Sequence, residues 1–241
     1  MPVADMLEDE KPGGQQHLVP VFDDFLGAAV QQLRFDPSGT PDVTVLGDAE
    51  GLATARIAAR LPQAVIAVID PSQGALDAAR KRAGEHTGLT FQTGDLRRAR
   101  LPKPADAVLS LLATQAFTAE EKIDFYSRTY QTLRPGGVLV HATRVAGEDE
   151  VLHQRQHWAW LSDIRARGVS EPGIAAALDE MQADQLSPLS VHLDWMRQIG
   201  FTHVDCSFRR GMFAVLSGEM PRNPAERPRN LFSVGRMLKR R

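Results

Sequence analysis

The stretch VTVLGDAEG, residues 43–51, opens the part of the chain that decides the fold. A short run rich in β-branched residues leads into Gly47, and Gly51 begins an Ala- and Arg-rich segment that suits a helix. A strand-like run that ends in a glycine loop and continues as a helix is typical of a buried parallel strand with its crossover. The stretch therefore predicts the first strand–loop–helix unit of an α/β domain.

The same alternation continues to residue 142. Further strands are expected at 64–69, 89–92, 105–112 and 138–142, and helices at 52–61, 73–83 and 118–133. Thr118 and Glu121 form a capping box at the start of the last helix. Apolar strands without polar alternation, separated by helices, indicate a parallel sheet that is covered on both faces. The sequence predicts a doubly wound, Rossmann-like α/β domain.

The alternation of strands and helices ends after residue 142. Helices are expected at 148–168, 171–185 and 187–200, the last with Ser187 as N-cap and Pro188 at its first position. Two strand-like runs, 203–208 and 212–217, flank Arg209-Arg210-Gly211, which is a β-hairpin signal. We therefore expect five parallel strands closed by an antiparallel β-hairpin, with a helical insert at about 148–190 that acts as a lid.

These elements divide the chain into a disordered tail at 1–16, one domain at 17–218 and a basic tail at 219–241. The domain is expected to begin with a helix over 17–34, followed by a break at the Pro- and Gly-rich residues 37–41.

Composition narrows the classes of function. With 43% hydrophobic residues in 241, the chain can bury a large core, and a net charge of -2 argues against nucleic acid or a membrane as partner. The single Cys206 excludes an internal disulfide, and no apolar stretch is long enough to span a bilayer. Without a signal-peptide pattern at its start, the protein is expected to be cytoplasmic; its Arg-over-Lys bias suggests a bacterial source. The sequence leaves open whether the protein forms a homodimer.

Three features mark strand ends, where open α/β sheets bind ligands. A glycine after a strand, such as Gly47, lets a ligand approach the backbone, although this loop also fits a plain structural turn. Asp70 lies nineteen residues beyond Gly51 and can accept hydrogen bonds from both hydroxyls of a ribose. Asp95, after the third strand, can receive an adenine amino group; it also fits a turn aspartate.

The string TLRPGGVL, residues 132–139, resembles the post-catalytic motif of class I methyltransferases, which depend on S-adenosylmethionine (SAM). Residues 68–72 and 106–110 resemble the second and fourth strands of that superfamily. The resemblance covers about residues 17–218 and is strongest at 133–137. Within the superfamily, the chain is similar to small-molecule methyltransferases and carboxy-SAM synthases with a late helical insert.

The resemblance implies SAM as cofactor. Its methionine part would lie at the first loop, its ribose at Asp70, and its adenine at Asp95 and Leu96. The full cofactor-binding prediction comprises Gly47, Asp48, Gly51, Asp70, Pro71, Asp95, Leu96 and Ser110.

The chain departs from the family pattern at three places. Val45 stands where an acid is usual, the first loop is poor in glycine, and Thr114-Gln115-Ala116 replaces a common Leu-His-His. We hypothesise that Asp48 reaches the ammonium group of SAM in place of the missing acid, with Glu50 as the alternative. A carboxy-SAM synthase would need an arginine where Trp195 stands, which disfavours that activity.

His153 and His157 stand four residues apart on one expected helix and are the candidates for a general base. Their spacing could chelate a metal, but no third ligand is evident, so no metal site is expected. The substrate pocket is predicted to include Gln115, Arg144, His157, Trp160 and Arg209, the last as a contact for an anionic substrate.

SAM-dependent methyl transfer to a small molecule is the function that the sequence favours. Such an enzyme mainly aligns its substrate with a reactive cofactor, so the lack of a legible catalytic side chain does not count against it. The alternative is a non-catalytic descendant that serves as a binding or assembly subunit, which the altered first loop favours and the retained Asp70 and Asp95 oppose. A nicotinamide-dependent oxidoreductase is disfavoured by the missing third glycine and by the hairpin.

Overall fold

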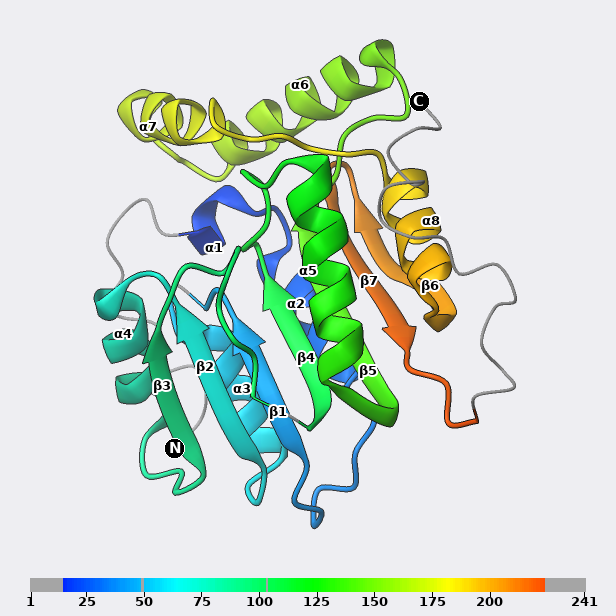
Figure 1. Ribbon diagram of the computed structural model, residues 1–241. Helices are drawn as coiled ribbons and strands as arrows, with labels where there is room; N and C mark the ends of the chain where they lie inside the picture. Colours follow the sequence, from blue (N-terminus) through cyan, green and yellow to red (C-terminus); the bar gives the residue numbers. More distant parts are fainter. Residues whose placement is uncertain (1–14, 49, 103, 224–241) are drawn as a thin grey trace.

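The computed structural model of the protein describes residues 15–48, 50–102 and 104–223. The expected tails at 1–16 and 219–241 therefore lie outside the described residues, except for residues 15, 16 and 219–223. Within the described ranges, one seven-stranded sheet runs through the molecule in the order β3-β2-β1-β4-β5-β7-β6 (Figure 1). The strands are β1 (Asp42–Leu46), β2 (Val65–Asp70), β3 (Leu89–Thr93), β4 (Ala105–Leu111), β5 (Leu133–Arg144), β6 (Thr202–Arg210) and β7 (Phe213–Glu219).

The sheet has the predicted arrangement. Strands β1 to β5 are parallel, β7 pairs antiparallel with β5, and β6 pairs antiparallel with β7. The doubly wound α/β class and the closing hairpin are thus confirmed. The helices are α1 (Gln15–Leu18), α2 (Phe22–Gln31), α3 (Leu52–Arg60), α4 (Gln73–Ala83), α5 (Ala119–Thr132), α6 (Glu150–Ala166), α7 (Glu171–Met181) and α8 (Leu189–Ile199).

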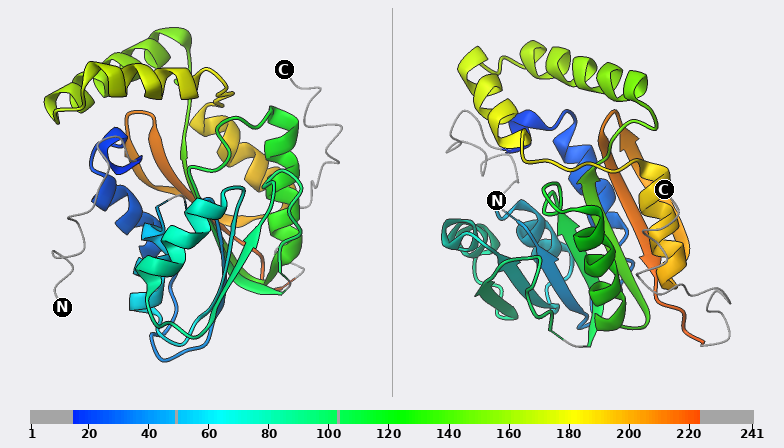
Figure 2. Two further views of the ribbon diagram at one scale, coloured as in Figure 1. Left: turned by 90° about the vertical axis from the view of Figure 1, so that its left-hand side faces the viewer. Right: turned by 45° about the horizontal axis from the view of Figure 1, so that its top comes forward.

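Helices cover both faces of the sheet. One hydrophobic cluster joins the sheet to α2, α3 and α4, and a second joins its other face to α5 and α8. Helices α6 and α7 lie across the carboxyl ends of the parallel strands (Figures 1 and 2). The insert is therefore placed over the edge of the sheet where α/β proteins bind ligands.

Several element boundaries differ from the predicted ones for local reasons. The single helix expected at 17–34 is split into α1 and α2, because Pro20 cannot donate a helical hydrogen bond and Val21 adopts a φ of 54°. Helix α8 begins at Leu189, after Pro188, so Ser187 does not cap it. Strand β5 starts at Leu133 because the RPGG turn joins its pairing with β4 through a register shift. The capping box of Thr118 and Glu121 is present at α5.

None of the helices in the described ranges is long and apolar enough to cross a membrane.

Candidate functional site

The carboxyl ends of β1, β2 and β3 meet at one edge of the sheet. Backbone hydrogen bonds connect them: the Gly47 N–H donates to the Ile69 carbonyl at 3.1 Å, and the Gly94 N–H donates to the Asp70 carbonyl at 3.1 Å. The loops that follow these strands are therefore neighbours, and they carry most of the residues that the sequence predicts for the cofactor.

Asp70 ends β2 and is largely buried, with 5% of its surface exposed. Its Oδ1 accepts a 2.8 Å hydrogen bond from the Ser72 backbone N–H, which fixes the direction of the carboxylate at the strand end. Burial raises the pKa of Asp70, and the backbone N–H groups of Ser72 and Asp48 counter that rise. Pro71 follows on the exposed surface.

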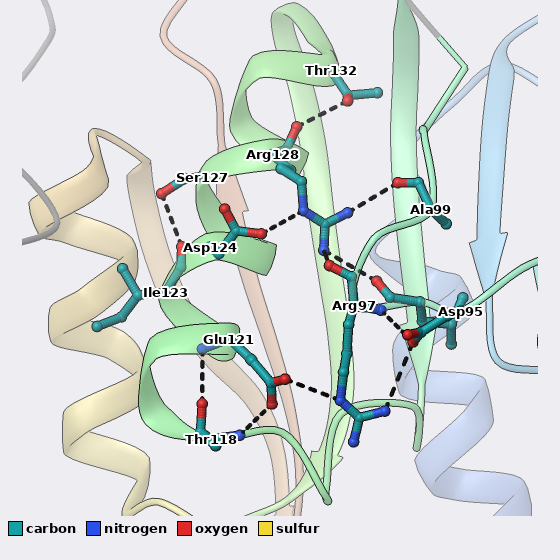
Figure 3. A network of polar contacts seen from close by, with 11 residues as sticks. Asp95, Arg97, Ala99, Thr118, Glu121, Ile123, Asp124, Ser127, Arg128 and Thr132 are labelled. Carbon is teal, nitrogen blue, oxygen red and sulfur yellow. Dashed lines mark hydrogen bonds and ion pairs between the residues drawn. The ribbon is translucent and has the colours of Figure 1, made fainter.

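Asp95 lies in the loop after β3, which is joined to α5 by a chain of polar contacts (Figure 3). Its Oδ1 accepts from the Arg97 backbone N–H at 3.0 Å, and the Arg97 Nε lies 3.2 Å from Glu121 Oε1 in the capping box of α5. The Arg128 guanidinium donates to the carbonyls of Leu96, Arg97 and Ala99. The Leu96 side chain is buried in the core.

Asp48 has a different role from the one that we hypothesised. Its carboxylate is 1% exposed and accepts hydrogen bonds from the backbone N–H groups of Ala53 at 3.1 Å and Thr54 at 2.7 Å. These donors belong to the first turn of α3, which has no carbonyl partners for them. Desolvation raises the pKa of Asp48 despite these bonds. The carboxylate therefore caps α3, a role that does not fit the ammonium contact hypothesised for it.

The two glycines of the first loop are required by packing. A Cβ on Gly51 would lie 2.4 Å from the Ala79 Cα in the backbone of α4, and a Cβ on Gly47 would lie 2.5 Å from the Ala113 Cβ. Their φ values, 71° and 72°, are also in the left-handed region. Gly51 thus permits α3 and α4 to approach closely, while Gly47 brings the first loop against the loop after β4.

The loop after β4, residues 112–116, forms a wall between the first loop and the insert. Leu112 adopts a φ of 46° and donates its N–H to the Ala142 carbonyl at 2.8 Å, so its strained backbone is held by β5. The Gln115 carbonyl accepts from the Gln185 N–H at 2.8 Å, which ties the insert to this loop. Ser110, at the end of β4, is fully buried, and its Oγ has no hydrogen-bond partner within the described ranges.

A buried polar cluster that the sequence did not predict contacts this loop at Thr114. Tyr126 Oη lies 2.8 Å from His141 Nδ1 and 2.7 Å from His192 Nδ1, and His141 Nε2 lies 2.9 Å from Thr114 Oγ1. All four side chains are buried. Desolvation lowers the pKa of His141 to about 3, so its imidazole is neutral at pH 7.

The first of two cavities beneath the insert, the Arg144 cavity, has a volume of about 290 Å³. It contains three predicted substrate residues, Gln115, Arg144 and Trp160. The Arg144 Nη2 lies 2.7 Å from Asp184 Oδ2, and the indole N–H of Trp160 donates to the Leu18 carbonyl at 2.7 Å. Ala113, which contacts Gly47, also lines this cavity.

The second cavity, the His153 cavity, adjoins the first and shares Met181 and Asp184 with it. His153 and His157 both line it from α6. Burial, and then the neighbouring His153, lowers the pKa of His157. Arg209 is exposed on β6 and lines neither cavity, so it is not positioned as the predicted contact for an anionic substrate. Across the described ranges, no three His, Cys, Asp or Glu side chains are grouped as metal ligands.

Comparisons with known proteins agree with this arrangement. Residues 43–137 match a protein family described as "Methyltransferase domain". A carboxy-S-adenosyl-L-methionine synthase of Chromohalobacter salexigens is 29% identical over 235 residues, which cover 89% of this chain and 83% of the synthase. A second such synthase, from Shewanella woodyi, is 27% identical over 232 residues, covering 89% of this chain and 92% of that protein.

Solved structures share the fold. The S-adenosylmethionine-dependent methyltransferase SibL in its apo form superimposes with a TM-score of 0.57 at 20% identity, and the match covers 82% of this chain and 55% of SibL. The chain thus spans about half the length of that enzyme.

Proposed function

Because this chain contains a class I SAM-dependent methyltransferase domain, we propose that it transfers the methyl group of SAM to a small molecule bound in the Arg144 cavity. The observation that carries the proposal is the position of Ala113. This residue packs against Gly47 at the predicted cofactor loop and also lines the Arg144 cavity, so the two proposed sites share one wall. Methyl transfer requires this proximity of donor and acceptor.

The strand-end residues fit the adenosyl half of SAM. Asp70 would accept hydrogen bonds from the ribose, and the turn at Asp95 and Leu96 would hold the adenine. At the methionine half, Val45 is buried and apolar and Asp48 caps α3, which leaves Glu50 as the candidate for the ammonium contact. The proposal therefore depends on Asp70 as its anchor.

When bound, SAM supplies a methyl group that is already electrophilic. The protein's own residues then have to orient the acceptor and exclude water. Trp160 is fixed by its hydrogen bond to Leu18 and, together with α7, covers the Arg144 cavity. His157, with its lowered pKa, is neutral at pH 7 and can accept a proton in the adjoining His153 cavity.

The names of the relatives favour a second candidate, synthesis of carboxy-SAM. The resemblance places Trp195 at the position of the arginine that such a synthase would need for the additional carboxylate. Trp195 is 6% exposed and packs against His192 with ring centroids 5.5 Å apart, so its position offers no positive charge. This residue favours methyl transfer over the synthase reaction.

Incubation with methyl-labelled SAM tests the proposal against both alternatives. A panel of single-ring amines, phenols and carboxylic acids serves as acceptor, and products are identified by mass. Label in an organic product, lost in Asp70→Asn and kept in Asp77→Asn, supports methyl transfer. A parallel incubation adds a readily decarboxylated acid as carboxyl donor, and carboxylated SAM there would support the synthase reaction. Binding of SAM without any product would support a binding subunit.

A further inference from the structure

We propose that the Arg144 cavity takes a small amine with an apolar ring and rejects carboxylates. This inference rests on the proposed function only in treating the cavity as the acceptor site. At about 290 Å³, the cavity is just below the roughly 300–1,000 Å³ that small-molecule sites span. A single ring with a short side chain is the size of ligand that it suits.

The walls of the cavity suit an apolar ring. Trp160, Phe213 and Leu112 contribute aromatic and aliphatic surface from the insert, β7 and the loop after β4. Trp160 and Phe213 are buried, so their rings are held in place by packing and not by the ligand. A ligand ring would replace water at this surface, which is the favourable part of its binding.

Acidic side chains outnumber basic ones among the described residues of the cavity. Arg144 is the only cationic side chain among its described lining residues, and it lies against two carboxylates, Asp184 and Glu180. The side chains of Arg144 and Asp184 are only 17% and 11% exposed, so their ion pair is poorly screened. Arg144 is therefore already neutralised, and a carboxylate ligand would have to displace Asp184 to reach it.

Asp184 also lines the cavity and adds negative charge to it. Its Oδ2 is buried in the ion pair with Arg144, so the 11% of the side chain that is exposed belongs to its other atoms. The exposed Glu180 carboxylate adds a second acceptor at the same cavity, and the adjoining His153 cavity contributes Asp149 and Glu150. An ammonium group gains charge-assisted hydrogen bonds here, whereas a carboxylate loses its hydration without a free cation in return.

The indole N–H of Trp160 does not change this balance. It donates to the Leu18 carbonyl at 2.7 Å, so it is not free to stabilise an anion. Gln115 is 7% exposed and lines the cavity as a neutral amide. Among the described residues that line it, the cavity thus has no uncommitted donor with a positive charge, unlike a carboxylate-binding site.

Three probes with the same ring test this inference. Tyramine, tyrosol and 4-hydroxyphenylacetate carry an ammonium, a hydroxyl and a carboxylate on one skeleton, and their affinities are measured by calorimetry without SAM. We expect tyramine to bind at least about tenfold more tightly than 4-hydroxyphenylacetate, with tyrosol between them. Equal or tighter binding of the carboxylate overturns the inference, as does failure of all three to bind at ten millimolar.

Two variants test whether Asp184 and Glu180 cause the preference for the amine. Asp184→Asn removes the carboxylate that neutralises Arg144. The affinity for 4-hydroxyphenylacetate should then rise about tenfold, and the affinity for tyramine should fall. Glu180→Gln changes an exposed side chain and keeps the fold, and it should reduce the ratio of tyramine to 4-hydroxyphenylacetate affinity severalfold. Asp163→Asn, on α6 but paired with Arg210 outside the cavity, is the matched control and should leave the order unchanged. An unchanged preference in both cavity variants would overturn the inference.

These outcomes are separable from the proposed function. Because no SAM is present, a protein that fails to bind SAM can still prefer the amine, in which case the methyl-transfer proposal fails and the ligand class stands. Conversely, SAM binding and methylation of a carboxylic acid would retain the proposed function and refute the ligand class.

Discussion

The Asp48 Oδ2 accepts a 2.7 Å hydrogen bond from the backbone N–H of Thr54, in the first turn of α3. With the bond from Ala53 to Oδ1, this contact commits the acid of the first loop to the protein itself. The loop therefore keeps the glycine-helix geometry of a cofactor site, while the residue that we expected to contact the cofactor stabilises the helix instead. We therefore propose that cofactor affinity depends on Asp70, at the end of the neighbouring strand β2.

Replacing Asp48 should reduce stability more than it reduces SAM affinity. Asp48→Ala leaves two buried N–H groups without acceptors, and we expect the free energy of unfolding to fall by about 1–3 kcal/mol. Urea unfolding measures the loss, with Asp77→Ala on the exposed face of α4 as the control. Unchanged stability combined with a more than tenfold loss of SAM affinity would instead identify Asp48 as a ligand contact.

The two causes that require glycine at position 51 can be separated. Gly51→Ala combines a positive φ with a Cβ placed 2.4 Å from the Ala79 backbone, whereas Gly168→Ala has a positive φ and open space around the Cβ. We expect Gly168→Ala to cost about 1–2 kcal/mol for the backbone conformation alone. Gly51→Ala should cost a further 1–3 kcal/mol, roughly, for overpacking against α4. Equal losses in thermal or urea unfolding would refute the close approach.

Stability should fall on acidification because of the buried imidazole of His141. Its pKa is about 3 in the folded protein and about 6.5 when unfolded, so the unfolded state binds more protons between these values. Stability is therefore lost as the pH falls below 6.5, by about 1.4 kcal/mol per pH unit. Between pH 7 and pH 5, the free energy of unfolding should therefore fall by about 2 kcal/mol less in His141→Gln than in the parent. Parallel pH profiles of the two proteins would contradict a neutral, buried His141.

Arg128 should matter more than other surface arginines. It donates to three carbonyls of the loop after β3 and pairs with Asp124, and its side chain is only 23% exposed (Figure 3). We expect Arg128→Ala to lower the free energy of unfolding by about 2–3 kcal/mol. Arg197→Ala, which removes an exposed pair with Asp194, should cost less than about 1 kcal/mol. Similar losses in urea unfolding would show that the loop does not depend on Arg128.

The sequence predicted the parts of the fold that local pattern controls. The apolar strands, the Thr118 capping box and the hairpin all follow from neighbours in the chain, and the parallel order then places Asp70 and Asp95 at one edge of the sheet. The split between α1 and α2 was missed because helical periodicity in the following residues outweighed the break at Pro20.

The rest of the site depends on contacts between distant segments. Tyr126, His141 and His192 come from α5, β5 and α8, and only His141 stands within an apolar run. His141 within the strand-like run 138–142 was the one available signal. The role of Asp48 was missed for a different reason: whether an acid faces a helix N-terminus or a ligand is decided by the backbone of its loop.

Calorimetric titration of SAM into the parent protein and Asp70→Asn tests the central claim most directly, since Asp70 is proposed as the anchor of the cofactor. We expect the parent to bind SAM, and Asp70→Asn to bind at least about tenfold more weakly because a charge-assisted hydrogen bond is worth roughly 1.5–3 kcal/mol. Asp77→Asn, which removes an exposed acid on α4, should bind as the parent does. Parent protein that binds no SAM at millimolar concentration, or Asp70→Asn with unchanged affinity, would contradict the account.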